Sequence, residues 1–203
     1  MNIKLLNDTK VGIAENVLTD EECKILHDYA VATKLAESGA IDVEAYSSST
    51  FMNLEEDKTY DLEKLTNFWG SKNVLTHDAP DHIRELISKL IDNSISPFAD
   101  YLEAIDASTK GFTRDLITFS PIHVYASGHN FGHHVDCHEY ALVFYVSDPS
   151  EFEGGELVYD AGPEITPSRG VLVIAPSDMP HEVLEVTSGY RCSLTAFFST
   201  TED

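Results

Sequence analysis

The sequence predicts an α+β domain in which N-terminal helices pack on one outer sheet face of a jelly roll (a double-stranded β-helix). Two observations predict this class. Residues 1–115 contain two segments with the apolar spacing of helices and are expected to be mainly helical support. In residues 116–199, short β-rich runs alternate with turn signals, which is typical of a sandwich or barrel. Because no linker or repeat separates the halves, residues 1–203 are expected to form a single domain.

Two helices are predicted in the first half. A capping box should start the first, because the Thr19 hydroxyl can accept from the Glu22 amide while Glu22 reaches back. The second is expected after Pro80, and Pro97 should interrupt it because proline lacks the amide that a helix interior requires. The same period should restart after Pro97, at Phe98, Tyr101, Leu102 and Ile105. Its apolar positions are Ile83, Leu86, Ile87, Leu90 and Ile91. The polar residues 37–62 are expected to form a loop with a short strand.

Six β-rich runs are predicted strands of the second half: 116–126, 141–147, 155–160, 170–176, 181–186 and 191–198. Turn signals stand between them at Asp148-Pro149, Gly154-Gly155, Pro167 to Gly170, and Ser188-Gly189.

The charge balance limits the class of partner. There are 35 acidic and 13 basic residues, and the net charge of −22 should repel polyanions. With no Lys/Arg cluster, neither nucleic acid nor an anionic membrane is expected as a partner. An acidic surface that keeps the protein soluble is the simplest interpretation, while a basic or neutral polypeptide partner stays open.

The expected location is cytoplasmic. The sequence has no signal-peptide pattern and no run of about 20 apolar residues that could span a membrane. The three cysteines are widely separated, so neither a disulfide framework nor a paired CxxC zinc site is predicted.

Residues 131–146, FGHHVDCHEYALVFYV, place three histidines and an aspartate before an apolar strand. Successive side chains of a strand point to opposite faces, so His134 and Asp136 would share one face and His133 would take the other. The pair can therefore reach one metal ion, and His133 is expected to pack or point outward. His138 has the parity to compete, although it could equally lie in the turn into the next strand.

A third ligand is expected from another strand. His181 is the candidate because it begins the run 181–186 and would be rigidly held, with Asp178 and Glu182 as alternatives. Two histidines and one carboxylate are the usual ligand set of non-haem Fe(II) oxygenases. Zinc bound by the same residues is the competing interpretation.

Arg191 and Ser193 share one face of a predicted core strand. A buried arginine is costly unless it meets an anion, and its planar fork suits a carboxylate. That carboxylate would belong either to the protein or to a small dicarboxylate lying between the metal and Arg191.

An ordered set of short motifs runs through residues 116–199. It comprises Tyr125, Gly128, Phe131, His134 and Asp136, then Tyr145, GGEL at 154–157, Pro167 and Gly170, and HEV at 181–183 followed by Arg191. This set resembles the 2-oxoglutarate- and Fe(II)-dependent oxygenases of the prolyl 4-hydroxylase-like branch. Residues 16–23 resemble the opening strand-to-helix step of that family more weakly.

The resemblance implies roles for the site residues. The iron ligands would be His134, Asp136 and His181. Arg191 would pair with the distal carboxylate of 2-oxoglutarate, and Ser193 could add a hydrogen bond to it. Tyr145 would lie near the same carboxylate and Tyr125 near the metal-bound end, although as bare residues both could equally be core aromatics. The implied reaction is hydroxylation of an unactivated C–H bond with Fe(II), 2-oxoglutarate and O2, with ascorbate as a further candidate cofactor.

The substrate is less defined, because the Arg-Thr-Ser stretch of relatives that act on peptidyl proline is absent and Trp69 is the single tryptophan. A prolyl residue of a peptide or protein is the first expectation, and another residue or a free small molecule is the second. Residues 37–62 are the candidate substrate loop, or equally an ordinary surface loop. Two other classes stay open: a zinc-dependent hydrolase with Glu139 or Glu182 as its base, and a non-catalytic jelly-roll binding module.

Overall fold

The computed structural model describes residues 3–6, 9–36, 52–53, 72–74, 79–107, 117–136, 138–160, 162 and 164–198. The two helices within these residues are α1 (Asp20–Ala36) and α3 (Asp81–Ala104). The strands are β1 (Lys4–Leu5), β2 (Gly12–Ala14), β3 (Met52–Asn53), β4 (Lys72–Val74), β5 (Ile117–Ala126), β6 (Phe131–Val135), β7 (Tyr140–Tyr145), β8 (Phe152–Gly154), β9 (Leu157–Tyr159), β10 (Glu164–Ile165), β11 (Leu172–Pro176), β12 (His181–Val183) and β13 (Val186–Phe198).

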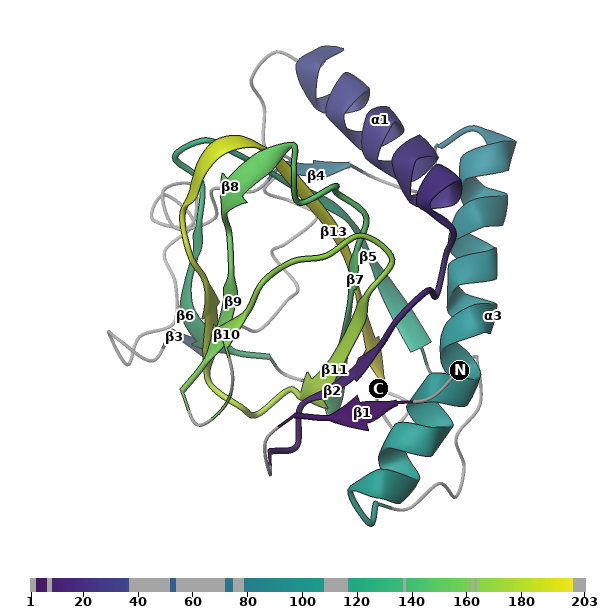
Figure 1. The fold of residues 1–203 in the computed structure, drawn as a ribbon, viewed down its shortest axis with the longest axis vertical. Coiled ribbons are helices and arrows are strands. Elements are labelled where there is room, and N and C mark those ends of the chain that lie inside the picture. The colour runs from purple at the N-terminus through teal and green to yellow at the C-terminus, as the bar shows by residue number, and fades with distance from the viewer. Residues whose placement is uncertain are drawn as a thin grey trace.

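The strands form two antiparallel sheets (Figure 1). The larger sheet has the order β1-β2-β11-β7-β13-β5-β4, with β8 pairing to β13, and the smaller has the order β10-β9-β12-β6-β3. Apolar side chains from both sheets form one buried cluster, in which Tyr145 and Val173 of the larger sheet join Phe131 and Leu157 of the smaller. The two sheets therefore face each other, and the fold is mostly antiparallel β with two helices.

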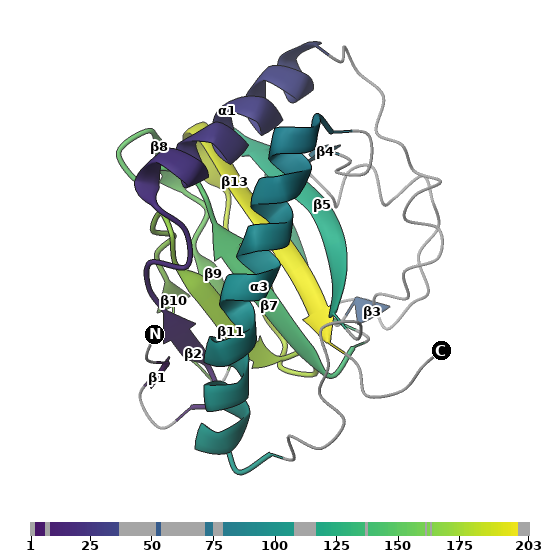
Figure 2. The ribbon, with the colours of Figure 1, turned by 90° about the vertical axis from the view of Figure 1, so that its right-hand side faces the viewer.

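Both helices lie along the larger sheet on the side away from the smaller one (Figure 2). α1 contacts β13, β5 and β4, and α3 contacts β1 and β11. A second buried cluster lies between the helices and the sheet, and it includes Leu26, Leu90, Phe98, Leu142 and Leu194. No helix in the described part of the chain has the length and hydropathy to cross a membrane.

The predicted capping box starts α1. The Thr19 amide donates to the Glu22 carboxylate over 3.0 Å, and the Glu22 amide donates to the Thr19 hydroxyl over 3.3 Å. Lys89 of α3 donates to the other oxygen of the same carboxylate. The cap thus satisfies free amides of the first turn and also joins the two helices.

The predicted interruption at Pro97 is wrong, because α3 continues through this residue to Ala104. A proline inside a helix costs roughly 3 kcal/mol through the lost hydrogen bond and the steric clash. Leu90, Phe98 and Tyr101 are nevertheless all buried on one face of the helix, together with Pro97. Packing of this continuous apolar face against the sheet outweighs the local cost.

The predicted turn at Ser188-Gly189 is also wrong, because β13 runs without interruption from Val186 to Phe198. Its register shifts between Val186 and Ser188, and Gly189 has a φ of +74°. A Cβ on Gly189 would lie 2.1 Å from the carbonyl oxygen of Glu151. The glycine therefore bends one strand, whose first part pairs with β8 and whose remainder pairs with β5 and β7.

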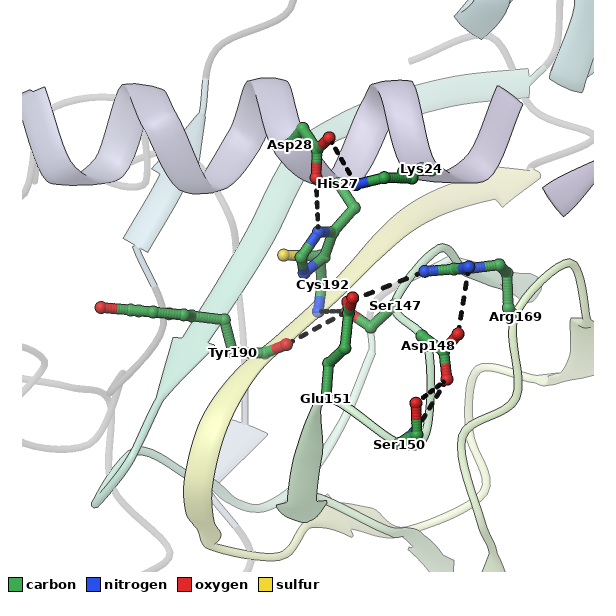
Figure 3. A network of polar contacts seen from close by, with 10 residues as sticks. All are labelled: Lys24, His27, Asp28, Ser147, Asp148, Ser150, Glu151, Arg169, Tyr190 and Cys192. Carbon is green, nitrogen blue, oxygen red and sulfur yellow. Dashed lines mark hydrogen bonds and ion pairs between the residues drawn. The ribbon is translucent and has the colours of Figure 1, made fainter. Parts of the chain in front are cut away.

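Polar contacts from neighbouring turns hold β13 near Cys192 (Figure 3). The Ser147 hydroxyl accepts a hydrogen bond of 2.6 Å from the amide of Cys192. Arg169 lies 3.1 Å from Asp148 and 3.7 Å from Glu151, which joins the turn at 148–151 to the turn before β11. These contacts hold the strand segment that carries Arg191.

Within residues 37–62, the structure describes Met52 and Asn53, which form β3. This confirms the predicted short strand, and β3 pairs with β6 at Val135 and His134. The rest of the predicted substrate loop lies outside the described residues, as do Trp69 and Cys137. Cys23 and Cys192 are free and buried.

Candidate metal centre and its pocket

The three predicted ligands come together on the smaller sheet. His134 lies on β6 and His181 begins β12, where the two residues are cross-strand partners. Asp136 directly follows β6, and its amide donates to the Ser177 carbonyl over 2.9 Å. One ligand atom from each of the three residues lies within 4.8 Å of the other two.

The orientation of both imidazoles suits metal binding. The Nδ1 atom of His134 lies 2.7 Å from the Gly132 carbonyl, and that of His181 lies 2.8 Å from the Met179 carbonyl. A carbonyl can only accept, so Nδ1 carries the proton and the Nε2 lone pair is left for a ligand. The two Nε2 atoms lie 3.7 Å and 3.6 Å from the two oxygens of Asp136. The hydrogen bond from Nδ1 to a backbone carbonyl is the usual second hydrogen bond of a metal-binding histidine.

Burial of these three side chains carries a desolvation cost when no metal is bound. Burial first, and the neighbouring His181 second, hold the pKa of His134 well below its usual range. Burial raises the pKa of Asp136 to about 6. Two imidazoles and a buried carboxylate form a donor set that a divalent cation would stabilise. The residues therefore fit a bound metal.

The other candidate ligands lie elsewhere. His133 points away from the group, and its Nε2 atom lies 2.7 Å from Asp160, as the strand parity predicts. His138 stacks on Phe197 with ring centroids 4.5 Å apart. Among the described residues neither histidine belongs to the ligand group, and the alternatives Asp178 and Glu182 do not belong to it either.

Arg191 lies in the same pocket as the three ligands, on β13 of the facing sheet. Its side chain is buried, with 1% of the residue exposed, and its Nη1 donates to the Ser193 hydroxyl over 3.1 Å. The guanidinium carbon lies 4.8 Å from the ring centre of Tyr125 and 5.1 Å from that of Tyr145. Within the described residues no carboxylate forms an ion pair with it, and both its Nε and the Tyr145 hydroxyl lack a hydrogen-bond partner. A buried cation with this surrounding requires an anion.

The predicted Gly154-Gly155 turn forms the wall behind Arg191. Gly155 has a φ of +72°, and a Cβ built on it would lie 2.6 Å from Cδ of Arg191. A glycine is required here by the backbone conformation and also by the close approach of the arginine.

The pocket also contains residues that the motifs did not indicate, namely His123, Thr195 and Phe197. Thr195 and Phe197 continue the alternation that begins with Arg191 and Ser193, so strand parity could have found them. His123 stands two residues before Tyr125 on β5, and the same parity rule applies to it.

The comparisons with known proteins concern the same part of the chain. Residues 120–199 match the family model described as the 2OG-Fe(II) oxygenase superfamily. A PKHD-type hydroxylase from Prochlorococcus marinus is 36% identical over 76 residues, which cover 32% of this chain and 34% of that protein. The chain thus matches about a third of the length of this curated relative.

Solved structures share the fold over nearly the whole chain. The viral collagen prolyl hydroxylase of Paramecium bursaria Chlorella virus-1 covers 96% of this chain at a TM-score of 0.58 and 17% identity, with 98% of its own chain covered. A Pseudomonas putida prolyl-4-hydroxylase covers 96% at 0.57 and 16% identity, with 95% of its own chain covered. A Trichoplax adhaerens prolyl hydroxylase, in complex with a hypoxia inducible factor peptide fragment, covers 96% at 0.59 and 14% identity, with 85% of its own chain covered.

The family match, the curated relative and the shared fold agree with the ligand group between the sheets. Residues 120–199 thus resemble the 2OG-Fe(II) oxygenase superfamily, a family of dioxygenases that use Fe(II), 2-oxoglutarate and O2, and the fold is shared with solved prolyl hydroxylases.

Proposed function

We propose that this protein hydroxylates a C–H bond of a prolyl residue in a peptide or protein, as a 2-oxoglutarate- and Fe(II)-dependent dioxygenase. The observation that carries the chemistry is the buried Arg191, which shares one pocket with the ligand group. The ligands alone would suit iron or zinc. A guanidinium without a carboxylate partner among the described residues favours an anion that reaches from the arginine toward the metal. 2-Oxoglutarate carries a carboxylate at each end and meets that requirement.

His134, Asp136 and His181 would hold the iron through two Nε2 atoms and one carboxylate. Such a set occupies one side of the metal and leaves the opposite positions for 2-oxoglutarate and O2. When bound, iron and 2-oxoglutarate supply the oxidising chemistry that hydroxylates an unactivated C–H bond.

The facing sheet would hold the cosubstrate. Arg191 would bind its distal carboxylate with two parallel N–H donors, while Ser193 orients the guanidinium through the 3.1 Å hydrogen bond. Tyr145 would donate its hydroxyl to the same carboxylate, and Tyr125 would lie toward the metal-bound end. Apolar wall residues such as Val143, Leu157 and Val183 would exclude water from the reaction.

We assign the two facing sheets to a double-stranded β-helix, in which residues 116–199 are the catalytic core. Residues 1–115 would then be mainly helical support for the larger sheet. The burial of side chains from α1 and α3 against that sheet supports this division of the single domain.

A prolyl substrate is supported by the solved prolyl hydroxylases that share the fold, one of which holds a peptide fragment. A net charge of −22 also favours a basic or neutral polypeptide over an anionic metabolite. Another residue or a free small molecule is the alternative for the same chemistry.

A zinc-dependent hydrolase is less well supported. It would need a general base beside the metal, and the two glutamates that could serve, Glu139 and Glu182, do not line the pocket. Hydrolysis would also leave Arg191 without a function. A non-catalytic binding module would have no need for three metal ligands in one geometry.

Anaerobic addition of Fe(II) and then 2-oxoglutarate to the metal-free protein tests the class. We expect a visible metal-to-ligand charge-transfer band, and tight zinc binding without such a band would refute the proposal. The substrate is tested by 2-oxoglutarate turnover with proline-rich peptides, free amino acids and small metabolites, with and without ascorbate. Peptides should gain one oxygen in step with succinate. If free metabolites gain it and no peptide does, the substrate assignment is wrong.

A further inference from the structure

His123 is a half-buried polar residue of the pocket, and neither the metal ligands nor Arg191 explains its presence there. It lies on β5, and its ring forms part of the pocket wall. Its Nδ1 atom is buried and has no hydrogen-bond partner among the described residues. A buried polar atom that makes no hydrogen bond costs about 1–3 kcal/mol. Because the ring also lines the pocket, a ligand bound there is the group that could satisfy this atom.

The register of the larger sheet places His123 at a defined distance from Arg191. His123 is the cross-strand partner of Ser193, whereas Arg191 is the partner of Tyr125. His123 therefore lies one strand over from Arg191 and two residues further along the sheet, which places the two backbone positions about 8 Å apart. This span is comparable to the length of an extended five-carbon dicarboxylate. A diacid anchored on Arg191 would bring its other end beside His123, with the metal ligands on the facing sheet.

The charge of the ring suits this position. Burial, and then the neighbouring Arg191 guanidinium, lower the pKa of His123 to about 4. The imidazole is therefore neutral near pH 7, and it can offer one N–H without placing a second cation beside Arg191.

We propose that His123 holds the metal-proximal, 2-oxo-acid end of 2-oxoglutarate by donating a hydrogen bond from its ring to an oxygen of that end. This inference rests on the proposed function, because it assumes that the pocket takes 2-oxoglutarate. It adds a second anchor, on β5, to the anchor that Arg191 provides on β13.

The test compares two ligands in anaerobic calorimetry on the Mn(II)-loaded protein. 2-Oxoglutarate carries both ends, whereas 2-oxopentanoate keeps the 2-oxo-acid end and lacks the distal carboxylate. We expect His123→Leu to weaken both ligands by the same factor of about ten, which corresponds to one lost hydrogen bond. Arg191→Met should weaken 2-oxoglutarate and leave 2-oxopentanoate unchanged. His123→Gln, which keeps a donor, should recover most of the affinity.

His27 offers a matched control. It is a buried histidine, 8% exposed, whose Nε2 also lacks a partner among the described residues. It lies on α1 outside the pocket and contacts Asp28 (Figure 3). His27→Leu should leave the affinity for both ligands unchanged. Mn(II) affinity should be the same in all variants, which separates a role toward the ligand from general loss of structure.

Each outcome decides the proposal. Unchanged affinity of both ligands in His123→Leu would overturn it, and so would a loss confined to 2-oxoglutarate, which would put His123 at the distal end. If His123→Leu does not fold, His123→Phe keeps a ring without nitrogen and should show the same loss. If the unaltered protein binds Mn(II) but no 2-oxoglutarate at all, the proposed function has failed, a result distinct from the failure of His123 alone.

Discussion

Replacement of Arg191 by methionine should change cosubstrate binding and protein stability in opposite directions. Methionine keeps much of the length of the side chain but removes the charge. The site is closed, because Arg191 is 1% exposed and its guanidinium lies between the rings of Tyr125 and Tyr145. Truncation of one partner of such a buried charge pair costs about 2–5 kcal/mol of binding free energy. At 1.4 kcal/mol for each factor of ten, the affinity for 2-oxoglutarate should fall roughly 30-fold to 4,000-fold.

The stability of the metal-free protein should respond differently. A buried cation without a carboxylate partner among the described residues carries a desolvation cost that nothing in those residues offsets. Removal of the charge should therefore leave the free energy of unfolding unchanged or raise it. Arg191→Lys should recover part of the ligand affinity, since it restores the charge without the planar fork.

Calorimetry with Mn(II) and 2-oxoglutarate, together with urea unfolding of the metal-free protein, measures both quantities. Unchanged affinity in Arg191→Met would refute the assigned role. A loss of several kcal/mol of stability would also contradict the reasoning, because it would mean that a carboxylate of the protein pairs with Arg191.

Three further predictions test other parts of the site. His134→Ala should abolish binding of one metal ion per chain, while His133→Ala should leave it intact, as measured by metal analysis after dialysis. Gly155→Ala puts a Cβ 2.6 Å from Cδ of Arg191 and should weaken 2-oxoglutarate binding while metal affinity is kept, as calorimetry would report. The pKa of His123 is lowered in the fold, to about 4. The unfolded chain therefore binds the extra proton below about pH 6.5, and this part of the stability is lost as the pH falls, by at most about 1.4 kcal/mol per pH unit. Urea unfolding at pH 7, 6 and 5 should show a smaller loss in His123→Gln.

The glycine prediction has its own control in the chain. Gly128 also has a positive φ, +84°, but a Cβ there would meet nothing within 4 Å. Gly128→Ala thus reproduces the backbone strain without the clash and should leave 2-oxoglutarate affinity unchanged. Equal loss in both alanine variants would mean that strain, and not the position of Arg191, is responsible.

For the metal prediction, loss of the ion in His133→Ala would contradict the strand parity. Equal pH slopes with and without His123 would contradict its lowered pKa.

The ligand group and Arg191 could be predicted because their signals are local. Strand parity separates His134 and Asp136 from His133 within four residues, and the structure confirms the separation. The role of Arg191 could be predicted from the general rule that a charged side chain buried in an apolar strand requires a partner of opposite charge. Strand parity places His123 on the same face as Tyr125, but it does not distinguish a pocket residue from a core residue, because an alternating segment such as IHVYA fits any core strand. What marks it is its register opposite Ser193, a contact between residues 70 positions apart in the sequence.

The two errors in the fold have a shared physical cause. Pro97 and Gly189 both disfavour regular local structure. The sequence predicts an interruption of the helix at Pro97, with the same period restarting after it, and a turn at Gly189. In both places long-range contacts continue the element, through the buried face of α3 and through the pairing of β13 with β8. Sequence propensities give the free-energy cost of a proline or glycine within a helix or strand. They do not include the free energy of the tertiary packing that outweighs this cost.

The arrangement of the two sheets explains why the pocket can hold its groups in fixed positions. β12 and β6 are interior strands of the smaller sheet, and β13 lies between β7 and β5 in the larger one. The strands that carry His134, His181 and Arg191 therefore have hydrogen-bonded neighbours on both sides. On β13 the alternation also turns Cys192 and Leu194 into the core beneath the helices, while Arg191 and Ser193 face the pocket. The same strand thus joins the helix-packed core to the part of the pocket that Arg191 and Ser193 line. Groups held by such strands need little rearrangement when a ligand arrives, which is what a site for a small charged cosubstrate requires.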